Sequence, residues 1–299
     1  MEPSLTAAPP TATAGPTRTF GQAIQATLRN LVRQPLPAVG LTIVLIILVV
    51  AVFAPIIAPY PYDAISRDVR QPPSPAHWFG TDSLGRDVFS RVVYGARDIL
   101  VLPAIITFLA VTIGMTIGLL LAYRGGWLDT VGSRFLDGLL AIPALLLALV
   151  VLGTVGSSPA GLIGVIVLLY VPLVARVVRS AALGLRSAGY VEAARLRGEP
   201  LPWMLFRELL PGVMPALVVE GALRFAYAIF LVTSLGFLGL GVQPPSPDWG
   251  RMVNEARASF DQAPWALWFP AAAIALLVIA VNLLSDGLRR VFRTEGSAR

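Results

Sequence analysis

Long stretches without a charged residue alternate along this chain with shorter stretches that carry arginine and acidic residues. Five charge-free runs lie between Arg33 and Asp63, Asp98 and Arg124, Asp137 and Arg176, Arg224 and Asp248, and Asp261 and Asp286. A helix needs about 20 mostly apolar residues to cross roughly 30 Å of hydrocarbon. Each run is long enough for that, so each predicts at least one membrane-spanning helix.

The third run is too long for one crossing. Its 38 residues would extend ~57 Å as a single helix, and residues 156–161 interrupt it with glycine, serine and proline. The pattern therefore predicts an all-α polytopic membrane protein with six transmembrane helices. We place them at about 36–58, 99–123, 136–155, 161–179, 214–238 and 265–288.

Composition supports a membrane protein and excludes several kinds of chemistry. Of the 299 residues, 56% are hydrophobic and 13% charged, against about 25% charged in a soluble domain. All 23 basic residues are arginine, there is no cysteine, and His77 is the one histidine. A phosphate loop needs lysine, and most zinc sites need cysteine or several histidines. We therefore expect no catalytic residues, no metal or cofactor, and no ATP hydrolysis by this chain.

The distribution of arginine predicts the orientation, because basic residues in short loops stay on the cytoplasmic side. With both termini cytoplasmic, 16 arginines and nine acidic residues fall inside, giving +7, and the outer side carries −1. Topology thus explains the pI near 10.3 without nucleic-acid binding. Residues 1–30 are rich in proline, threonine and alanine and predict a disordered cytoplasmic tail. The apolar run over 36–58 is longer than a signal-peptide core and predicts a retained anchor.

The segment 180–213, between the fourth and fifth helices, is longer than a plain connection requires. Its apolar spacing predicts two short amphipathic helices, broken by glycine and proline. The residues involved are Val191, Ala194 and Leu196, then Gly198, Pro200 and Pro202, then Met204, Leu205 and Leu209. On the residues alone, two alternatives stay open: a surface that fits the groove of another protein, or helices lying on the lipid headgroups.

This segment resembles the E-A-A loop of bacterial ABC importer permeases. The residues that match the pattern are Glu192, Ala193, Ala194, Gly198, Leu210 and Pro211. Further stretches look like the dipeptide, oligopeptide and nickel branch: 79–91, 94–97, 235–241 with Pro245, Trp249 and Gly250, and 282–289. The resemblance covers about residues 30–290 and is to the C-type permease subunit. Two positions depart from it, since Glu208 stands where histidine is common and Arg197 replaces an aliphatic residue.

The resemblance implies a type I ABC importer permease fold in a bacterial inner membrane. It implies a heterodimer with a second homologous permease, two cytoplasmic ATPase subunits, an extracytoplasmic binding protein, and contact with lipid but not nucleic acid. Residues 31–98 would hold the first helix and an extracytoplasmic segment, 99–290 a five-helix core, and 291–299 a second cytoplasmic tail. Dipeptides or oligopeptides are the favoured substrates, with nickel or another small solute left open.

By the same resemblance, the E-A-A loop would be a coupling helix seated in a groove of one ATPase. Glu192 would begin or orient that helix, Ala193 and Ala194 would permit close approach, and Gly198 would permit the following turn. ATPase closure would then move the loop and open the pathway alternately to each side.

Two charged residues interrupt the fifth predicted helix. Glu220 and Arg224 are four residues apart and so share one helix face, and a charged group inside a membrane usually faces protein or a water-filled path. They predict either part of the substrate pathway or its gate, or a mutually satisfied structural pair with the arginine reaching toward headgroups. A secondary transporter should place ionisable residues deep in several helices, and only this pair qualifies.

Three further patterns in the sequence carry a weaker signal. Asp82, Arg86, Asp87, Ser90 and Arg91 would be the nearest candidates for enzyme chemistry, but their spacing favours an amphipathic surface helix. His77, beside a tryptophan, is interpreted as a packing or hydrogen-bonding residue rather than a metal ligand. The run 114–118 fits a G-x-x-x-G helix-packing face, with incidental glycines as the alternative.

Overall fold

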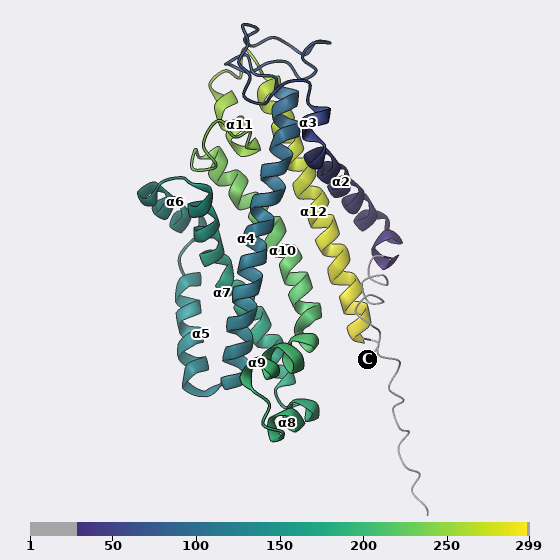
Figure 1. The fold of residues 1–299 in the computed structure, drawn as a ribbon, viewed down its shortest axis with the longest axis vertical. Coiled ribbons are helices and arrows are strands. Elements are labelled where there is room, and N and C mark those ends of the chain that lie inside the picture. The colour runs from purple at the N-terminus through teal and green to yellow at the C-terminus, as the bar shows by residue number, and fades with distance from the viewer. Residues whose placement is uncertain (1–28, 298–299) are drawn as a thin grey trace, which may run out of the picture.

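The computed structural model describes residues 29–297 and is helical throughout its membrane-crossing length (Figure 1). The elements are α2 (Pro35–Val52), α3 (Ala54–Ile57), α4 (Val88–Arg124), α5 (Gly126–Leu140), α6 (Ala144–Val155), α7 (Pro159–Leu185), α8 (Gly189–Leu196), α9 (Leu201–Trp203), the π-helical η1 (Met204–Leu209), α10 (Leu210–Phe237), α11 (Trp249–Arg257) and α12 (Trp265–Ser297). Five helical segments of this part of the chain are long and apolar enough to span a membrane, and the bent pair α5–α6 makes up to six. The prediction of a six-helix membrane protein is confirmed.

The prediction of one helix over 136–155 is wrong in its shape. Helices α5 and α6 meet at an angle of 80°, with Pro143 at the break. Proline disfavours helical backbone at the residue before it, so the run turns at Ile142. Helix α5 also begins ten residues early, at Gly126, because α7 supplies partners for its charges: Arg179 Nη2 donates to Asp129 Oδ2 at 2.7 Å.

Helix α4 begins eleven residues earlier than expected, at Val88. The Asp87 side chain caps it by accepting a hydrogen bond from the Ser90 N–H at 2.7 Å, which satisfies one of the free donors of a helix start. Its 37 residues extend ~55 Å, well beyond the hydrocarbon. The first turns of α4 therefore stand clear of the membrane.

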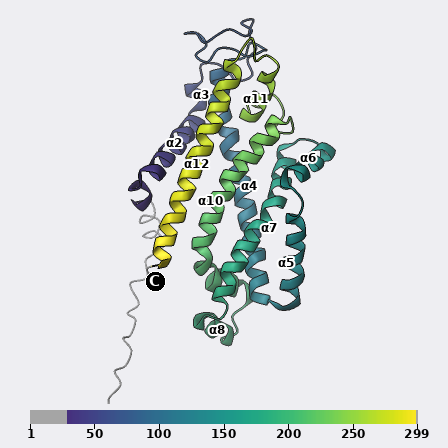
Figure 2. The same ribbon diagram turned by 180° about the vertical axis from the view of Figure 1, so that it is seen from behind.

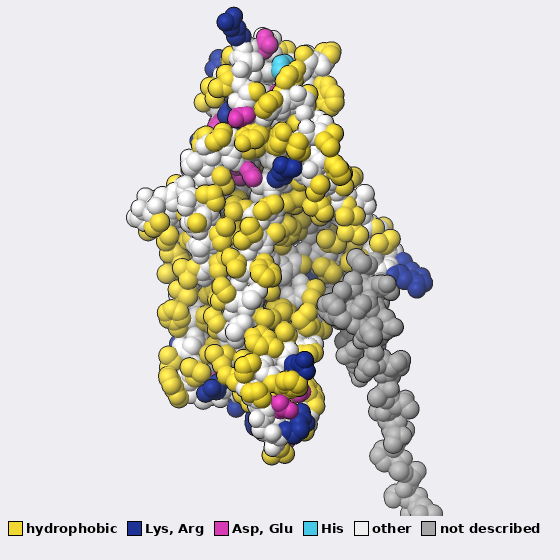
Figure 3. Space-filling view, viewed as in Figure 1, with side chains coloured by type: hydrophobic (Ala, Val, Ile, Leu, Met, Phe, Trp, Pro, Cys, Tyr) yellow, Lys and Arg dark blue, Asp and Glu magenta, His cyan; other side chains and the backbone are white. Residues whose placement is uncertain are grey.

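The bundle has two unlike ends (Figures 1 and 2). Helix α11 and the irregular segment 58–87 gather at one, here called the α11 end, and α8 lies beyond the opposite, α8 end. Hydrophobic side chains cover the middle of the molecule on the face seen in Figure 3, and charged side chains gather mainly toward the ends. This is the distribution that a bilayer requires.

Helices α4 and α7 form the most extensive contact, and two glycines explain it. A Cβ at Gly114 would lie 2.7 Å from Val174 Cβ, and one at Gly118 would lie 2.5 Å from the Ala175 carbonyl oxygen. Only glycine permits this approach of two backbones. The predicted G-x-x-x-G packing face is confirmed.

Candidate functional site

The predicted coupling segment forms three short elements, α8, α9 and η1, that precede α10 directly. Val191 and Ala194 of α8 are fully buried and pack with buried residues of η1 and the inner faces of α4, α7 and α10. Met204, Leu205 and Leu209 of η1 belong to the same cluster. Leu196 does not: it is 85% exposed, so the expectation that it shares the buried face is wrong. Helix α8 is thus fastened to the bundle by few side chains.

Helix α8 ends in a turn that depends on Gly198. The N–H of Gly198 donates to the Arg195 carbonyl at 3.0 Å and that of Glu199 to the Ala194 carbonyl at 3.3 Å, the two bonds of a Schellman cap. Gly198 has φ 75°, a conformation that costs other residues about 1–2 kcal/mol. At the other end, Glu192 lies in the first turn, where a negative charge complements the helix dipole.

The matched pair of alanines faces two ways. Ala194 is fully buried, whereas Glu192 and Ala193 are exposed. The exposed surface of α8 therefore carries a small side chain at Ala193 and a charged one at Glu192. Leu210 and Pro211 open α10, with Pro211 exposed and Leu210 packed against the buried cluster. Proline 211 lacks the N–H that an α-helix would bond to the carbonyl of Arg207, a local reason for the wider η1 turns.

The two departures from the family pattern contact each other. Arg197 Nη2 lies 3.6 Å from Glu208 Oε1, and Arg197 Nε lies 3.3 Å from Glu199 Oε1. Glu208 also accepts a hydrogen bond from the Trp203 indole at 3.2 Å. The ion pair joins the turn after α8 to η1.

Glu220 and Arg224 form an ion pair on α10. Arg224 Nε lies 2.8 Å from Glu220 Oε1, with side-chain exposures of 12% and 8%. The guanidinium also lies over the rings of Tyr170, at 5.5 Å, and Tyr227, at 5.1 Å. Arg224 is fourteen residues into the 28-residue α10, about halfway along this helix. Glu220 additionally lines an open cavity.

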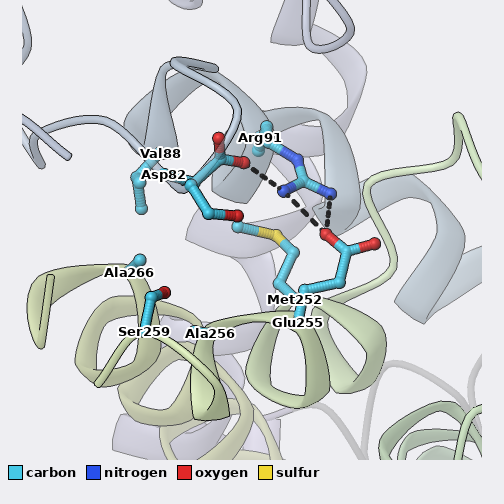
Figure 4. Close-up of a pocket in the computed structure, with 9 residues that line it drawn as sticks. Asp82, Val88, Arg91, Met252, Glu255, Ala256, Ser259 and Ala266 are labelled. Atoms are coloured by element: carbon cyan, nitrogen blue, oxygen red, sulfur yellow. Dashed lines mark hydrogen bonds and ion pairs between the residues drawn. The ribbon is translucent and has the colours of Figure 1, made fainter. Parts of the chain in front are cut away.

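The charged residues at the α11 end do not form an exposed helix face as expected. Asp82 Oδ2 accepts from Arg86 Nε and from Arg91 Nη1, both at 2.7 Å, and all three residues are buried. Glu255 of α11 completes the network, 2.8 Å from Arg86 Nη2. It also lies 3.2 Å from Arg91 Nη2 (Figure 4). Burial alone would raise the pKa of Glu255, but Arg91 and Arg86 outweigh it and hold that pKa below its ordinary value.

The cavity beside this buried network is too small to hold a substrate. The cavity beside Asp82, Arg91 and Ser259 measures about 10 Å³, enough for about one water molecule. Nearby, His77 Nδ1 is 2.9 Å from Asp87 Oδ1 and its ring lies 5.0 Å from that of Tyr60. His77 thus has the hydrogen-bonding and packing role that the sequence predicts. The arrangement fastens segment 58–87 to α4 and α11.

Comparisons with known proteins agree over most of the chain. Residues 111–294 match the family described as "binding-protein-dependent transport system inner membrane component", and residues 23–73 match "N-terminal TM domain of oligopeptide transport permease C". A dipeptide transport system permease protein of Alkalihalophilus pseudofirmus is 38% identical over 87% of this chain and 86% of its own length. Glutathione transport system permease proteins of Pectobacterium atrosepticum and Escherichia coli are 40% and 42% identical, each over 87% of both chains.

A crystal structure of an amino acid ABC transporter with histidines aligns with 68% of this chain at 18% identity and a TM-score of 0.47, a likeness too remote to transfer detail. The family match and the identities settle membership. This chain belongs to the binding-protein-dependent transport system inner membrane components, as a C-type permease subunit of an ABC importer.

Proposed function

We propose that this subunit forms, with a second homologous permease, the translocation pathway for dipeptides or other short peptides. Its relatives are named as dipeptide and glutathione permeases, which supports a peptide substrate. Two cytoplasmic ATPases would drive the transport, and an extracytoplasmic binding protein would deliver the peptide. Residues 99–290 would form the permease core, and 31–98 an addition ahead of it.

The observation that carries the proposal is the construction of α8. It is an eight-residue helix that lies beyond the end of the bundle (Figure 1), held by Val191 and Ala194 and closed by a glycine-dependent cap. Its exposed side presents Glu192 and Ala193. A helix with so few attachments can be displaced as a unit by a bound partner, as coupling to an ATPase requires.

This assignment fixes the proposed orientation. The α8 end would face the cytoplasm, with both termini on that side, and the α11 end would face outward in a bacterial inner membrane. The excess of arginine in the loops at the α8 end supports it. In this orientation the buried network at the α11 end underlies the surface on which a binding protein would dock.

The coupling assignment is tested on the complete transporter reconstituted in proteoliposomes. We expect Gly198→Pro, which cannot adopt φ 75°, and Glu192→Arg to leave the subunit in the membrane and to abolish most substrate-stimulated ATP hydrolysis. Arg124→Glu, a charge reversal of the same size at an exposed site of the α8 end outside the loop, serves as the control and should keep wild-type stimulation. Unchanged stimulation in both loop variants would refute the coupling role.

The substrate class is tested separately by ATP-dependent uptake. Tritiated leucyl-leucine should accumulate in proteoliposomes that contain the binding protein, and nickel should not. Nickel uptake without peptide uptake would replace the peptide proposal by the alternative in the same family.

A further inference from the structure

An open cavity of about 420 Å³ lies between α7, α10 and α12, in the half of the bundle nearer the α8 end. Its apolar walls include Val177 of α7 and Val219 and Leu223 of α10. Two charged side chains of opposite sign also line it, Glu220 of α10 and Arg289 of α12. A cavity with one carboxylate, one guanidinium and apolar walls is complementary to a molecule with an ammonium group, a carboxylate and an apolar body.

Glu220 is held in place on this cavity. Its side chain is 8% exposed and lies 2.8 Å from Arg224 Nε, and Arg224 is in turn fixed over the rings of Tyr170 and Tyr227. Arg224 is not among the residues that line the cavity. It is therefore a positioning residue, which orients the Glu220 side chain, while only Glu220 is presented to a ligand.

Arg289 is presented differently, at the exposed rim. Its side chain is 45% exposed, and the carboxylate of Asp286 is 4.0 Å from Nη1, at the limit of an ion pair. A guanidinium carries five N–H donors in a fork that matches a carboxylate. Such a contact leaves donors of Arg289 free for a carboxylate in the cavity.

We propose that this cavity binds a zwitterionic short peptide, with its ammonium group at Glu220 and its terminal carboxylate at Arg289. The apolar walls would receive the peptide's side chains. The proposal rests on the proposed peptide-import function and adds to it a binding site within the permease, with Arg289 as a specificity-determining residue. It predicts that the permease itself discriminates free peptides from peptides blocked at either end.

The test measures binding of tritiated leucyl-leucine to the assembled permeases and ATPases without the binding protein. Unlabelled leucyl-leucine, its N-acetyl derivative and its C-terminal amide compete for the site. We expect each blocked form to compete about tenfold more weakly than the free dipeptide, the effect of losing one charge-assisted hydrogen bond.

The variants assign each peptide end to its residue. Arg289→Gln should weaken binding of the free dipeptide about tenfold and remove the difference between free dipeptide and amide, while the N-acetyl form still competes more weakly. Glu220→Gln should do the reverse. Arg290→Gln is the matched control, since this neighbouring exposed arginine is not among the lining residues, and it should behave as wild type. If the Glu220→Gln variant does not assemble, the Arg289→Gln variant alone tests the proposal, because Arg289 lies at the exposed rim and its substitution should not disturb folding.

Equal competition by the three forms in the wild type would overturn the site, as would an Arg289→Gln variant that keeps the preference for a free carboxylate. Uptake of leucyl-leucine by the complete transporter separates this failure from that of the proposed function. Uptake together with indiscriminate binding removes only the site. Absence of uptake, with nickel transported instead, removes the peptide function as well.

Discussion

The two ends of the molecule hold their charged residues in opposite ways. At the α11 end, Arg91 and Asp82 are buried, with side-chain exposures of 3% and 9%, and Glu255 joins them from a distant part of the chain. At the α8 end, Arg197 pairs with Glu199 and Glu208 while its side chain remains 57% exposed. The first arrangement surrounds its charges with protein, and the second leaves them in contact with solvent.

This difference separates a fixed end from an adjustable one. Removing one partner of a buried ion pair costs about 3–5 kcal/mol because the other charge is stranded, whereas exposed pairs contribute about 0–1 kcal/mol. Segment 58–87, α4 and α11 are therefore locked to one another. The turn between α8 and η1 can change its ion pairs at little cost, which suits the coupling role that we propose for α8.

The largest expected effect comes from breaking the buried network. Arg91→Ala would remove one of the two guanidiniums that Asp82 and Glu255 share and leave Arg86 between two carboxylates. We therefore expect a loss of about 3 kcal/mol and a strong fall in the melting temperature of the purified subunit. Arg197→Ala, at the α8 end, should lower the free energy of unfolding by no more than about 1 kcal/mol. Thermal unfolding in detergent compares them, and equal shifts would show that the two ends do not differ in this way.

Two glycine substitutions, one near each end, test whether the α11 end is packed more tightly than the α8 end. A Cβ at Gly95 of α4 would lie 2.5 Å from Cδ1 of Trp249, so Gly95→Ala forces α4 and α11 apart and should cost about 1–3 kcal/mol. A Cβ at Gly184, near the α8 end of α7, meets nothing within 4 Å. Gly184→Ala should therefore leave the melting temperature unchanged or raise it, since alanine favours helix by up to about 1 kcal/mol. A loss of stability at Gly184 as large as at Gly95 would contradict the comparison.

We also expect the stability of the α11 end to depend on pH through Asp248, the buried residue that caps α11. Burial raises the pKa of Asp248 to about 6, against the hydrogen bond from the Arg251 N–H and with a further raising effect from Asp98. Folding therefore favours the protonated form. The contribution of Asp248 to stability is greatest below the unfolded pKa near 4 and falls as pH rises to about 6.

Asp248→Asn removes this charge and keeps the oxygen that caps α11. At pH 7.5 we expect a gain of about 1 kcal/mol, less than the full shift because the new amide also needs a partner. Melting curves from pH 4 to 8 measure it, and the gain over wild type should shrink toward pH 4. A variant that is less stable at pH 7.5 would show that ionised Asp248 is needed.

The spans were predictable because each is set by local composition, whereas the contacts between them were not. Charge-free length was enough to locate α2, α7, α10 and α12 to within a few residues at most of their ends. It failed at the start of α5, because the charge-free run begins only at Asp137 whereas α5 begins at Gly126. Asp129 lies within this helix because Arg179 of α7 pairs with it. An ion pair across 50 residues has no signature in a run of hydrophobic residues.

Contacts between distant residues also explain why the sequence wrongly predicts an exposed helix face at the α11 end. Arg86 and Arg91 have a helical spacing that an exposed face would also show, and their partner Glu255 lies 169 and 164 residues away. At the α8 end the loop pattern located α8, and Gly198 signalled its cap. The exposure of Leu196 depends on the direction in which α8 packs, which Val191 and Ala194 settle only in three dimensions.

The smallest expected effect is the coupling between Arg197 and Glu208, the two residues that depart from the family pattern. Arg197→Glu alone would bring three carboxylates together, and Glu208→Arg alone would add a second guanidinium. The double variant restores opposite charges across the same contact. We expect each single change to lower substrate-stimulated ATP hydrolysis and the double variant to recover part of it, with an interaction of about 0.2–1 kcal/mol that weakens as salt is added.

Arg195→Glu with Glu208→Arg is the control, because the Arg195 guanidinium lies over the Tyr123 ring, 5.4 Å from its centroid, and should show no coupling. If the Arg197 and Glu208 effects simply add, the two residues act through separate contacts with the ATPase and do not compensate each other within the loop.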